Sequence, residues 1–143
     1  MTRRVRPALL ALATFAGLAT AAQAEVAQGF KSPSGNIHCL YDEGSKEFPA
    51  SLRCDIVKTS NKKPKAPKDC PLDYGNAFEL KTSGRGEFLC YSDTILGADY
   101  KVLPYGQTWT QGGLTCFSAE SGVTCRNSAG GGLELSRARQ RVF

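Results

Sequence analysis

The chain contains few of the residues on which most catalytic and metal sites depend. Histidine is the usual acid–base group at neutral pH, and the 143 residues include one, His38. A Ser-His-Asp or Cys-His catalytic arrangement would have to use it. Its position beside Cys39 in an expected strand predicts an exposed histidine that faces away from that neighbour. A zinc hydrolase would lack a second imidazole ligand.

Several spacings that are typical of ligand sites are missing as well. The cysteines never occur at the C-x-x-C spacing of thiolate zinc sites, and no segment has the D-x-D-x-D-G spacing of a calcium loop. Gly130-Gly131-Gly132 lacks the lysine and the Ser or Thr of a phosphate loop and is interpreted as a flexible turn. No stretch of the mature chain has a long 3.6-residue apolar period, which disfavours a helical bundle. We therefore predict no metal and no cofactor.

The one long apolar run lies near the N-terminus and predicts a signal peptide. Three arginines at positions 3, 4 and 6 precede an apolar run from Ala8 to Ala22, and small residues end it at Ala22 and Ala24. A membrane span needs about 20 continuous apolar residues, and this run is shorter. We expect residues 1–24 to be removed before Glu25. Residues 25–143 would then form a single domain, free in the periplasm or the medium and without a transmembrane span.

Removal of this segment changes the charge of the chain. The whole sequence has 18 basic and 13 acidic residues and a net charge of +5. The predicted signal peptide holds three of the arginines and no acid, which leaves 15 basic against 13 acidic residues, a net charge of +2. The basic character is therefore mainly a targeting feature, and we do not expect nucleic acid to be a partner.

All six cysteines follow the predicted cleavage site, and an even number in an exported chain predicts three disulfides. They are Cys39, Cys54, Cys70, Cys90, Cys116 and Cys125. Two expected strands, at residues 114–117 and 123–126, flank a turn-rich centre, so Cys116 and Cys125 would face each other across a hairpin.

The same argument applies to the first two cysteines. Residues 36–41 and 52–57 flank a polar loop and would bring Cys39 beside Cys54. Elimination leaves Cys70 with Cys90.

The mature sequence consists of short strand patterns separated by turn signals. We expect strands at residues 35–40, 52–57, 78–80, 88–92, 101–103, 107–110, 114–118 and 123–127. Turn signals include Pro33-Ser34-Gly35 and Pro104-Tyr105-Gly106. This pattern predicts a mainly β fold, a small antiparallel sandwich or open barrel that disulfides hold together. A short C-terminal helix over residues 133–142 is an open alternative.

Two basic segments are candidates for binding anions. Residues 58–71 form a proline-rich loop that proline keeps extended, and the second segment lies near the C-terminus. Their basic residues are Lys58, Lys62, Lys63, Lys65 and Lys68 in the loop, and Arg126, Arg137, Arg139 and Arg141 in the second segment. If the second segment is a strand, Arg137, Arg139 and Arg141 share one face with Leu133 and Leu135. The alternative for both segments is a solvated surface.

Aromatic side chains are further candidates for a recognition surface, because they dominate binding hot spots. They are Tyr41, Tyr74, Tyr91, Tyr100, Tyr105 and Trp109. Trp109 alternates with Thr108 and Thr110, a pattern that favours a buried position for the indole.

Carboxylates are the remaining groups with catalytic potential. Asp93 and Asp99 flank an expected loop, and Asp42, Glu43 and Glu47 cluster before Cys54. A glycosidase needs two carboxylates that face a cleft and differ in pKa. The sequence spacing singles out no such pair. A small extracytoplasmic hydrolase that uses Asp93 or Asp99 is therefore kept as the alternative function.

Short motifs occur in a specific order along nearly the whole mature chain. They are Phe30-Lys31-Ser32-Pro33-Ser34-Gly35-Asn36-Ile37-His38-Cys39, Arg53-Cys54-Asp55-Ile56, Asp93-Thr94, Leu103-Pro104-Tyr105-Gly106, Gly122-Val123-Thr124-Cys125-Arg126-Asn127, and Ser136-Arg137 with Phe143. This set resembles a family of small exported bacterial proteins whose domain has no assigned function. The resemblance implies export and disulfides, and it implies no activity.

These observations together predict a non-enzymatic, extracytoplasmic binding module. Its partner would be another protein or an envelope component such as an anionic polymer, since the anions outside the cytoplasm are acidic polysaccharide, lipopolysaccharide and lipid headgroups.

Overall fold

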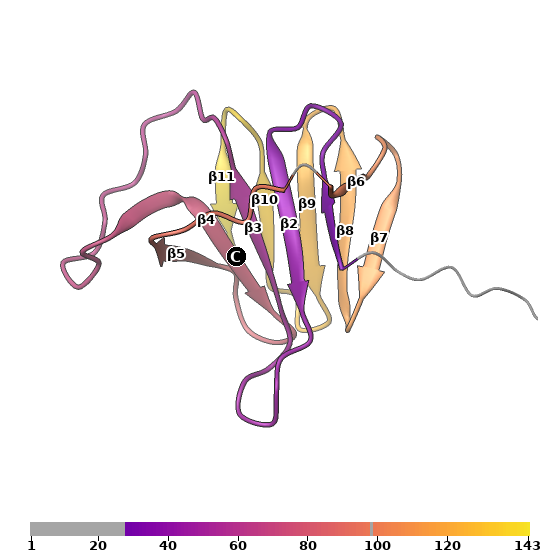
Figure 1. The fold of residues 1–143 in the computed structure, drawn as a ribbon, viewed down its shortest axis with the longest axis horizontal. Helices are drawn as coiled ribbons and strands as arrows, with labels where there is room; N and C mark the ends of the chain where they lie inside the picture. Colours follow the sequence, from indigo (N-terminus) through magenta and orange to yellow (C-terminus); the bar gives the residue numbers. More distant parts are fainter. Residues whose placement is uncertain (1–27, 98) are drawn as a thin grey trace, which may run out of the picture.

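Eleven strands, arranged as two facing sheets, make up the described part of the chain. The computed structural model describes residues 28–97 and 99–143, so the predicted signal peptide and its cleavage site lie outside the described residues. Within them the fold is all β and has no helix, which confirms the predicted disulfide-stapled sandwich (Figure 1). None of the described residues belongs to a helix that is long and apolar enough to cross a membrane.

The first sheet has the strand order β5-β4-β3-β2-β1-β6. Its strands are β1 (Gly29–Lys31), β2 (Ile37–Asp42), β3 (Ser51–Ile56), β4 (Asp73–Lys81), β5 (Glu87–Tyr91) and β6 (Lys101–Val102). Neighbouring strands are antiparallel except β1 and β6, which are parallel. The crossover segment (residues 92–97 and 99–100) connects β5, at one edge of this sheet, to β6 at the other.

The second sheet is a continuous antiparallel meander with the order β11-β10-β9-β8-β7. Its strands are β7 (Thr108–Gln111), β8 (Leu114–Ala119), β9 (Gly122–Asn127), β10 (Gly132–Leu135) and β11 (Gln140–Val142). Alternation along β8 shows why these residues form half-buried strands: Leu114, Cys116 and Ser118 are buried, and the intervening Thr115 and Phe117 are exposed.

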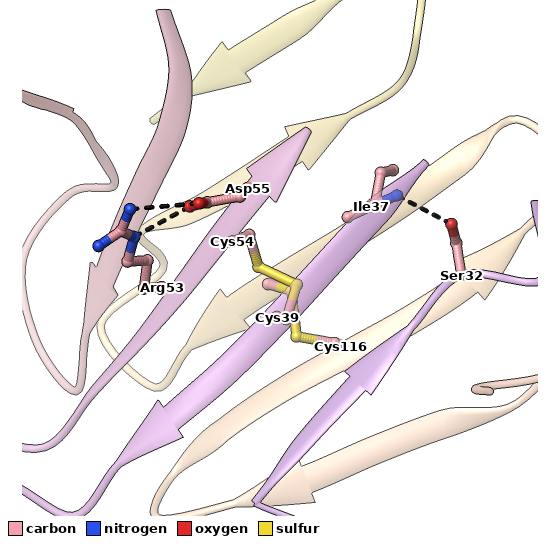
Figure 2. The surroundings of a disulfide bond; sticks show 8 residues. Ser32, Ile37, Cys39, Arg53, Cys54, Asp55 and Cys116 are labelled. Carbon is pink, nitrogen blue, oxygen red and sulfur yellow. Dashed lines mark hydrogen bonds and ion pairs between the residues drawn. A yellow bond between two sulfur atoms is a disulfide. The ribbon is translucent and has the colours of Figure 1, made fainter. Parts of the chain in front are cut away.

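Two disulfides occupy the centre of the core, one in each sheet. Cys39 and Cys54 are directly opposed in the β2–β3 register with a Cα–Cα distance of 4.1 Å. Cys116 and Cys125 are opposed in the β8–β9 register at 4.0 Å. All four side chains are fully buried. The sulfur atoms of Cys39, Cys54 and Cys125 lie within 4.8 Å of one another, so the two disulfides pack together across the sandwich (Figure 2).

The third disulfide joins Cys70, in the loop before β4, to Cys90 in β5, with a Cα–Cα distance of 5.7 Å. Cys90 is exposed and Cys70 is half-buried. The three pairs are those expected from the sequence. The first two bring strand neighbours together, whereas the third pins an irregular loop to a sheet edge.

The open alternative of a C-terminal helix is wrong. Leu133 and Leu135 alternate into the core between the sheets, and the chain reverses at a turn that Ser136 and Arg139 close with backbone and side-chain hydrogen bonds. Burial of the two leucines in a sheet overrides the weak helical pattern of this segment.

The expected common face of three arginines with these leucines is also wrong. Because of the turn, Arg141 pairs in register with Glu134, which points away from the core. Arg139 also reaches Glu134, whereas Arg137 lies in the turn itself.

The burial of His38 corrects another expectation. Its side chain does face away from Cys39, on the outer side of the first sheet, but it is 8% exposed rather than solvent-accessible. The crossover segment covers this face, and the ring of Tyr100 lies 6.0 Å from the imidazole (Figure 1). Trp109 is buried as expected.

Candidate functional site

A pocket of about 480 Å³ opens at one end of the sandwich, where turns from both sheets meet. The β1–β2 turn, the residues that follow β3, the β8–β9 turn and the β10–β11 turn all lie at this end, the upper end in Figure 1. Tyr105, between β6 and β7, completes the lining. We call this hollow the end pocket. Four of its five parts are turns that lie far apart in the sequence. Their proximity therefore cannot be read from the sequence.

The β1–β2 turn supplies the most ordered wall of the end pocket. Ser32 accepts the Gly35 amide at its carbonyl oxygen (2.8 Å), and its Oγ accepts the Ile37 amide at 3.1 Å (Figure 2). Gly35 has φ +68°, a left-handed conformation that glycine adopts without steric penalty. Pro33 pre-sets the backbone of the same turn. The Pro-Ser-Gly sequence therefore forms the predicted turn, and its serine hydroxyls lie at the pocket.

Lys58 enters the lining just after β3. The Asn36 side chain bonds both backbone polar groups of Lys58, and the Val57 amide donates to the Asn36 carbonyl oxygen at 2.9 Å. The backbone of Lys58 is thus fixed, while its side chain is exposed. Within residues 28–97 and 99–143 its ammonium forms no ion pair.

Arg137 reaches the end pocket from the β10–β11 turn. Its carbonyl oxygen accepts the Ser60 amide at 2.8 Å and the Ser60 hydroxyl at 3.3 Å. These bonds tie the turn to the segment that carries Lys58. Like Lys58, the Arg137 guanidinium has no carboxylate partner in the described part of the chain.

Unlike Arg137, the neighbouring Arg139 and Arg141 form ion pairs. Glu134 binds Arg139 at 2.7 Å and Arg141 at 2.9 Å. Desolvation acts to raise the pKa of Glu134, but the hydrogen bonds and positive charges of Arg141 and Arg139 together outweigh it and hold the pKa below its ordinary value. Two of the three candidate C-terminal arginines are therefore already neutralised by this carboxylate.

The remaining lining combines an aromatic ring with polar groups. Tyr105 is 44% exposed, and Glu120 and Ser121 come from the β8–β9 turn. Gly122, the first residue of β9, has φ +138°, and a Cβ there would overlap the carbonyl oxygen of Leu135. This glycine therefore lets the start of β9 approach β10 closely beside the pocket.

Residues 8–143 match the model of a protein family of unknown function, DUF6636. The chain belongs to the DUF6636 family. No curated protein and no solved structure gives a significant match to it.

Four of the six sequence motifs named above contribute residues to the end pocket. Ser32 and residues 34–37 come from the long opening motif, Tyr105 from Leu-Pro-Tyr-Gly, Gly122 from the Gly-Val-Thr-Cys segment, and residues 136–137 from Ser-Arg. Of these pocket residues, the sequence pattern marked Arg137 as an anion-binding candidate and Tyr105 as a candidate for a recognition surface. Lys58, which lies outside the motifs, was also a candidate for binding anions. The missed lining residues were visible as motif members, but only the fold brings them together.

The other candidate lysines, Lys62, Lys63, Lys65 and Lys68, are exposed on the loop and do not line the end pocket. Arg126, the remaining basic candidate, lies over the ring of Phe143 at 4.8 Å on the outer face of the second sheet. These residues are therefore separate from the site that Lys58 and Arg137 share.

The candidate catalytic aspartates lie elsewhere. Asp93, in the crossover segment, accepts a bond from Arg53 at 3.3 Å and is 81% exposed at its side chain. Asp99 is also exposed. Neither lines the end pocket.

Arg53 is the centre of a charge network that the sequence did not reveal. It binds the buried carboxylate of Asp55 through two nitrogens, at 2.9 and 3.2 Å (Figure 2). It also donates to the Asp93 carbonyl oxygen at 2.6 Å. Burial acts to lower the pKa of Arg53, but the hydrogen bonds and negative charges of Asp55 and then Asp93 outweigh this effect. The pKa therefore lies above its ordinary value. Asp55 also accepts the Ile95 amide at 3.1 Å. The network fastens the crossover segment to the first sheet.

A second hollow, of about 590 Å³, lies on the outer face of the first sheet. It is larger than the end pocket, but its two basic residues are already paired with carboxylates. Lys81 binds Glu79 at 3.5 Å, and Arg53 belongs to the network above. Asp42, on its rim, accepts the Gly44 amide at 2.6 Å. The end pocket is therefore the better candidate for an anionic ligand.

Proposed function

We propose that the chain is an extracytoplasmic, non-enzymatic binding protein whose ligand places an anionic group in the end pocket. The observation that carries the proposal is that Lys58 and Arg137 border one pocket without an ion-pair partner among the described residues. Charge-assisted bonds from lysine and arginine to a carboxylate or phosphate are about twice as strong as neutral hydrogen bonds. Two cationic residues at one pocket therefore favour an anion over a neutral ligand.

The shape and the other lining groups support a ligand of moderate size. Known ligand pockets have volumes of about 300–1,000 Å³, and the end pocket measures about 480 Å³. Its polar lining includes Ser34 and Ser121, and Tyr105 offers an exposed ring. Glu120 is the one acidic residue of the lining, so the charge of the site stays positive.

The disulfides support the location. Disulfides persist in oxidising compartments and are rare in the cytosol, and three join the six cysteines here. Together with the predicted signal peptide, they favour a periplasmic or secreted protein.

The rival function, hydrolysis by Asp93 or Asp99, has weaker support. Asp93 is exposed and engaged by Arg53, and neither aspartate lines the end pocket. A carboxylate pair in a cleft is what a glycosidase needs, and these two residues do not provide it.

The test uses the exported protein with its disulfides intact and two probes, galacturonate and inorganic phosphate. We expect at least one probe to bind by calorimetry and to shift NMR signals of the β1–β2 turn. Lys58→Gln and Arg137→Gln should each weaken binding by about tenfold, as expected for loss of one charged hydrogen bond. The matched controls are Lys101→Gln and Arg85→Gln, two exposed residues outside the pocket.

The proposal fails if neither probe binds. It also fails if the two pocket variants bind the probes as tightly as the two controls.

A further inference from the structure

We infer that the ligand is an acidic polysaccharide and that residues 61–68, here called the lysine arm, form an elongated second part of its binding site. This inference rests on the proposed function of the end pocket. The arm starts three residues after Lys58 and leads away from the pocket along the side of the first sheet (Figure 1). A polymeric ligand bound at Lys58 could therefore extend along the arm and contact its lysines.

The sequence of the arm determines an extended conformation. Pro64 and Pro67 fix their own φ angles, and each restricts the residue before it, Lys63 and Ala66, to extended backbone. The structure agrees, because residues 62–67 contain no strand, turn or bend. Extended, proline-rich segments of this kind favour the polyproline II form, which has three residues per turn and rises about 3.1 Å per residue.

This geometry sorts the side chains into rows. In that form, residues three apart share an edge, so we expect Lys62 and Lys65 on the same edge, about 9 Å apart (three residues at ~3.1 Å each). Pro64 and Pro67 would share another edge. Lys68 follows in the turn that ends the arm, where the Cys70 amide donates to the Pro67 carbonyl oxygen at 3.1 Å.

Three attachments hold the arm in place. At its start, the Ser60 amide donates to the Arg137 carbonyl oxygen. In the middle, Pro64 and the stem of Lys63 lie against Gly75 of β4, where a Cβ would be 3.2 Å from the Pro64 Cδ. At its end, the Cys70–Cys90 disulfide binds it to β5. A segment fixed in this way loses little conformational entropy on binding, which favours a binding role.

The charges of the arm are available to a ligand. Its lysine residues are exposed, and none forms an ion pair within the described residues. One acidic residue, Asp69, follows Lys68 at the far end. The basic surface thus runs from Arg137 and Lys58 in the end pocket to Lys65 on the arm, and a polymer with repeated negative charges can contact both parts.

The pocket chemistry favours a polysaccharide over a nucleic acid. Sugar hydroxyls suit the serine-rich lining, and the face of Tyr105 suits a sugar ring.

The experiment compares galacturonate with polygalacturonate oligomers of increasing length, using the exported protein. We expect affinity to rise with oligomer length and to fall steeply with added salt, because exposed charges are screened within about 10 Å at 0.1 M salt. Lys62→Gln with Lys65→Gln should weaken binding of the long oligomers by about tenfold and leave galacturonate binding unchanged. The matched control is Lys46→Gln with Lys101→Gln, which removes the same charge from exposed positions elsewhere.

The outcomes separate the two proposals. Affinity that does not depend on length, or an arm variant that binds oligomers like the control, would show that the arm is only a connector, even if galacturonate still binds the pocket. Absence of galacturonate binding would overturn the polysaccharide assignment, and the proposal for the pocket fails as well only if phosphate does not bind either. Tighter binding of an oligothymidylate of equal charge would overturn the polysaccharide assignment. Thermal melting of each variant verifies that the fold is retained.

Discussion

The side chain of Asn36 binds both backbone polar groups of Lys58. Its Nδ2 donates to the Lys58 carbonyl oxygen at 3.0 Å, and its Oδ1 accepts the Lys58 amide at 3.0 Å. Asn36 thereby continues the β2–β3 pairing by one step beyond the last register pair, Ile37 with Ile56. The β1–β2 turn and Lys58, which is proposed to bind the ligand, are therefore held together as one structural unit.

Loss of this contact should be measurable. Asn36→Ala removes both hydrogen bonds, and we expect unfolding free energy to fall by about 1–3 kcal/mol, at about 0.5–1.5 kcal/mol per bond. Asn36→Asp retains the acceptor for the Lys58 amide and should fall between wild type and Asn36→Ala. Urea unfolding measures the series. Equal stability of all three proteins would mean that water replaces the contact without loss.

The three disulfides should differ in their reactivity toward a thiol reductant. Cys90 is exposed and Cys70 half-buried, whereas Cys39 and Cys116, like their partners, are fully buried. A thiolate must reach a sulfur atom to reduce the bond, so Cys70–Cys90 should be reduced first under native conditions. Alkylation at successive times followed by peptide mass spectrometry gives the order. Early labelling of Cys39 or Cys116 would contradict the expectation.

Two glycines of the end pocket provide a matched pair. Gly35→Ala places a methyl group in open space at φ +68°, and we expect a loss of about 1–2 kcal/mol from the left-handed backbone. Gly122→Ala adds an overlap with the Leu135 carbonyl oxygen at φ +138°, and it should lose more than about 3 kcal/mol. Chemical denaturation compares the two. A similar loss in both variants would show that β10 moves aside freely.

Glu134 gives a prediction on pH. Arg141 and Arg139 hold the pKa of this carboxylate below its ordinary value in the folded protein. A lowered folded pKa stabilises the fold above the unfolded pKa, and this contribution disappears as the pH falls through the folded value. An NMR titration of the Glu134 side chain should show the low pKa, and Arg141→Gln should move it upward. An unchanged titration curve in that variant would exclude Arg141 as a cause.

The predicted export can be checked by intact mass. Protein recovered from the periplasm or the medium should lack residues 1–24 and begin at Glu25, because Ala22 and Ala24 present small residues to a signal peptidase. An intact Met1 on membrane-bound protein would refute cleavage and release.

Much of the architecture follows from local sequence. Alternation in the segments around Cys39, Cys54, Cys116 and Cys125 identified four strands, and the symmetry of two hairpins predicted two disulfides. Turn residues such as Gly35 marked chain reversals correctly, since only glycine adopts φ above zero without strain. These features depend on neighbours a few residues apart, which a single sequence displays.

Features that depend on the second sheet or on distant segments were not predictable in the same way. The C-terminal helix alternative is wrong because Leu133 and Leu135 are buried in a strand that packs against β9 and the first sheet. His38 is buried because the crossover segment, fastened through Arg53 and Asp55, happens to pass over it. Short strands such as β1 are too brief to leave a pattern of their own.

The sequence by itself determined the strand-rich class, the three disulfide pairs, the turns and the extended lysine arm, because each follows from local backbone preference or from cysteine spacing. Only the tertiary structure decided which charges are available. Glu134 neutralises Arg139 and Arg141, since the register of β10 and β11 places them together. Lys58 and Arg137, far apart in the chain, border one pocket. Ion pairs form wherever folding brings opposite charges within reach, and that distance is set by strand register and turn geometry rather than by order along the chain.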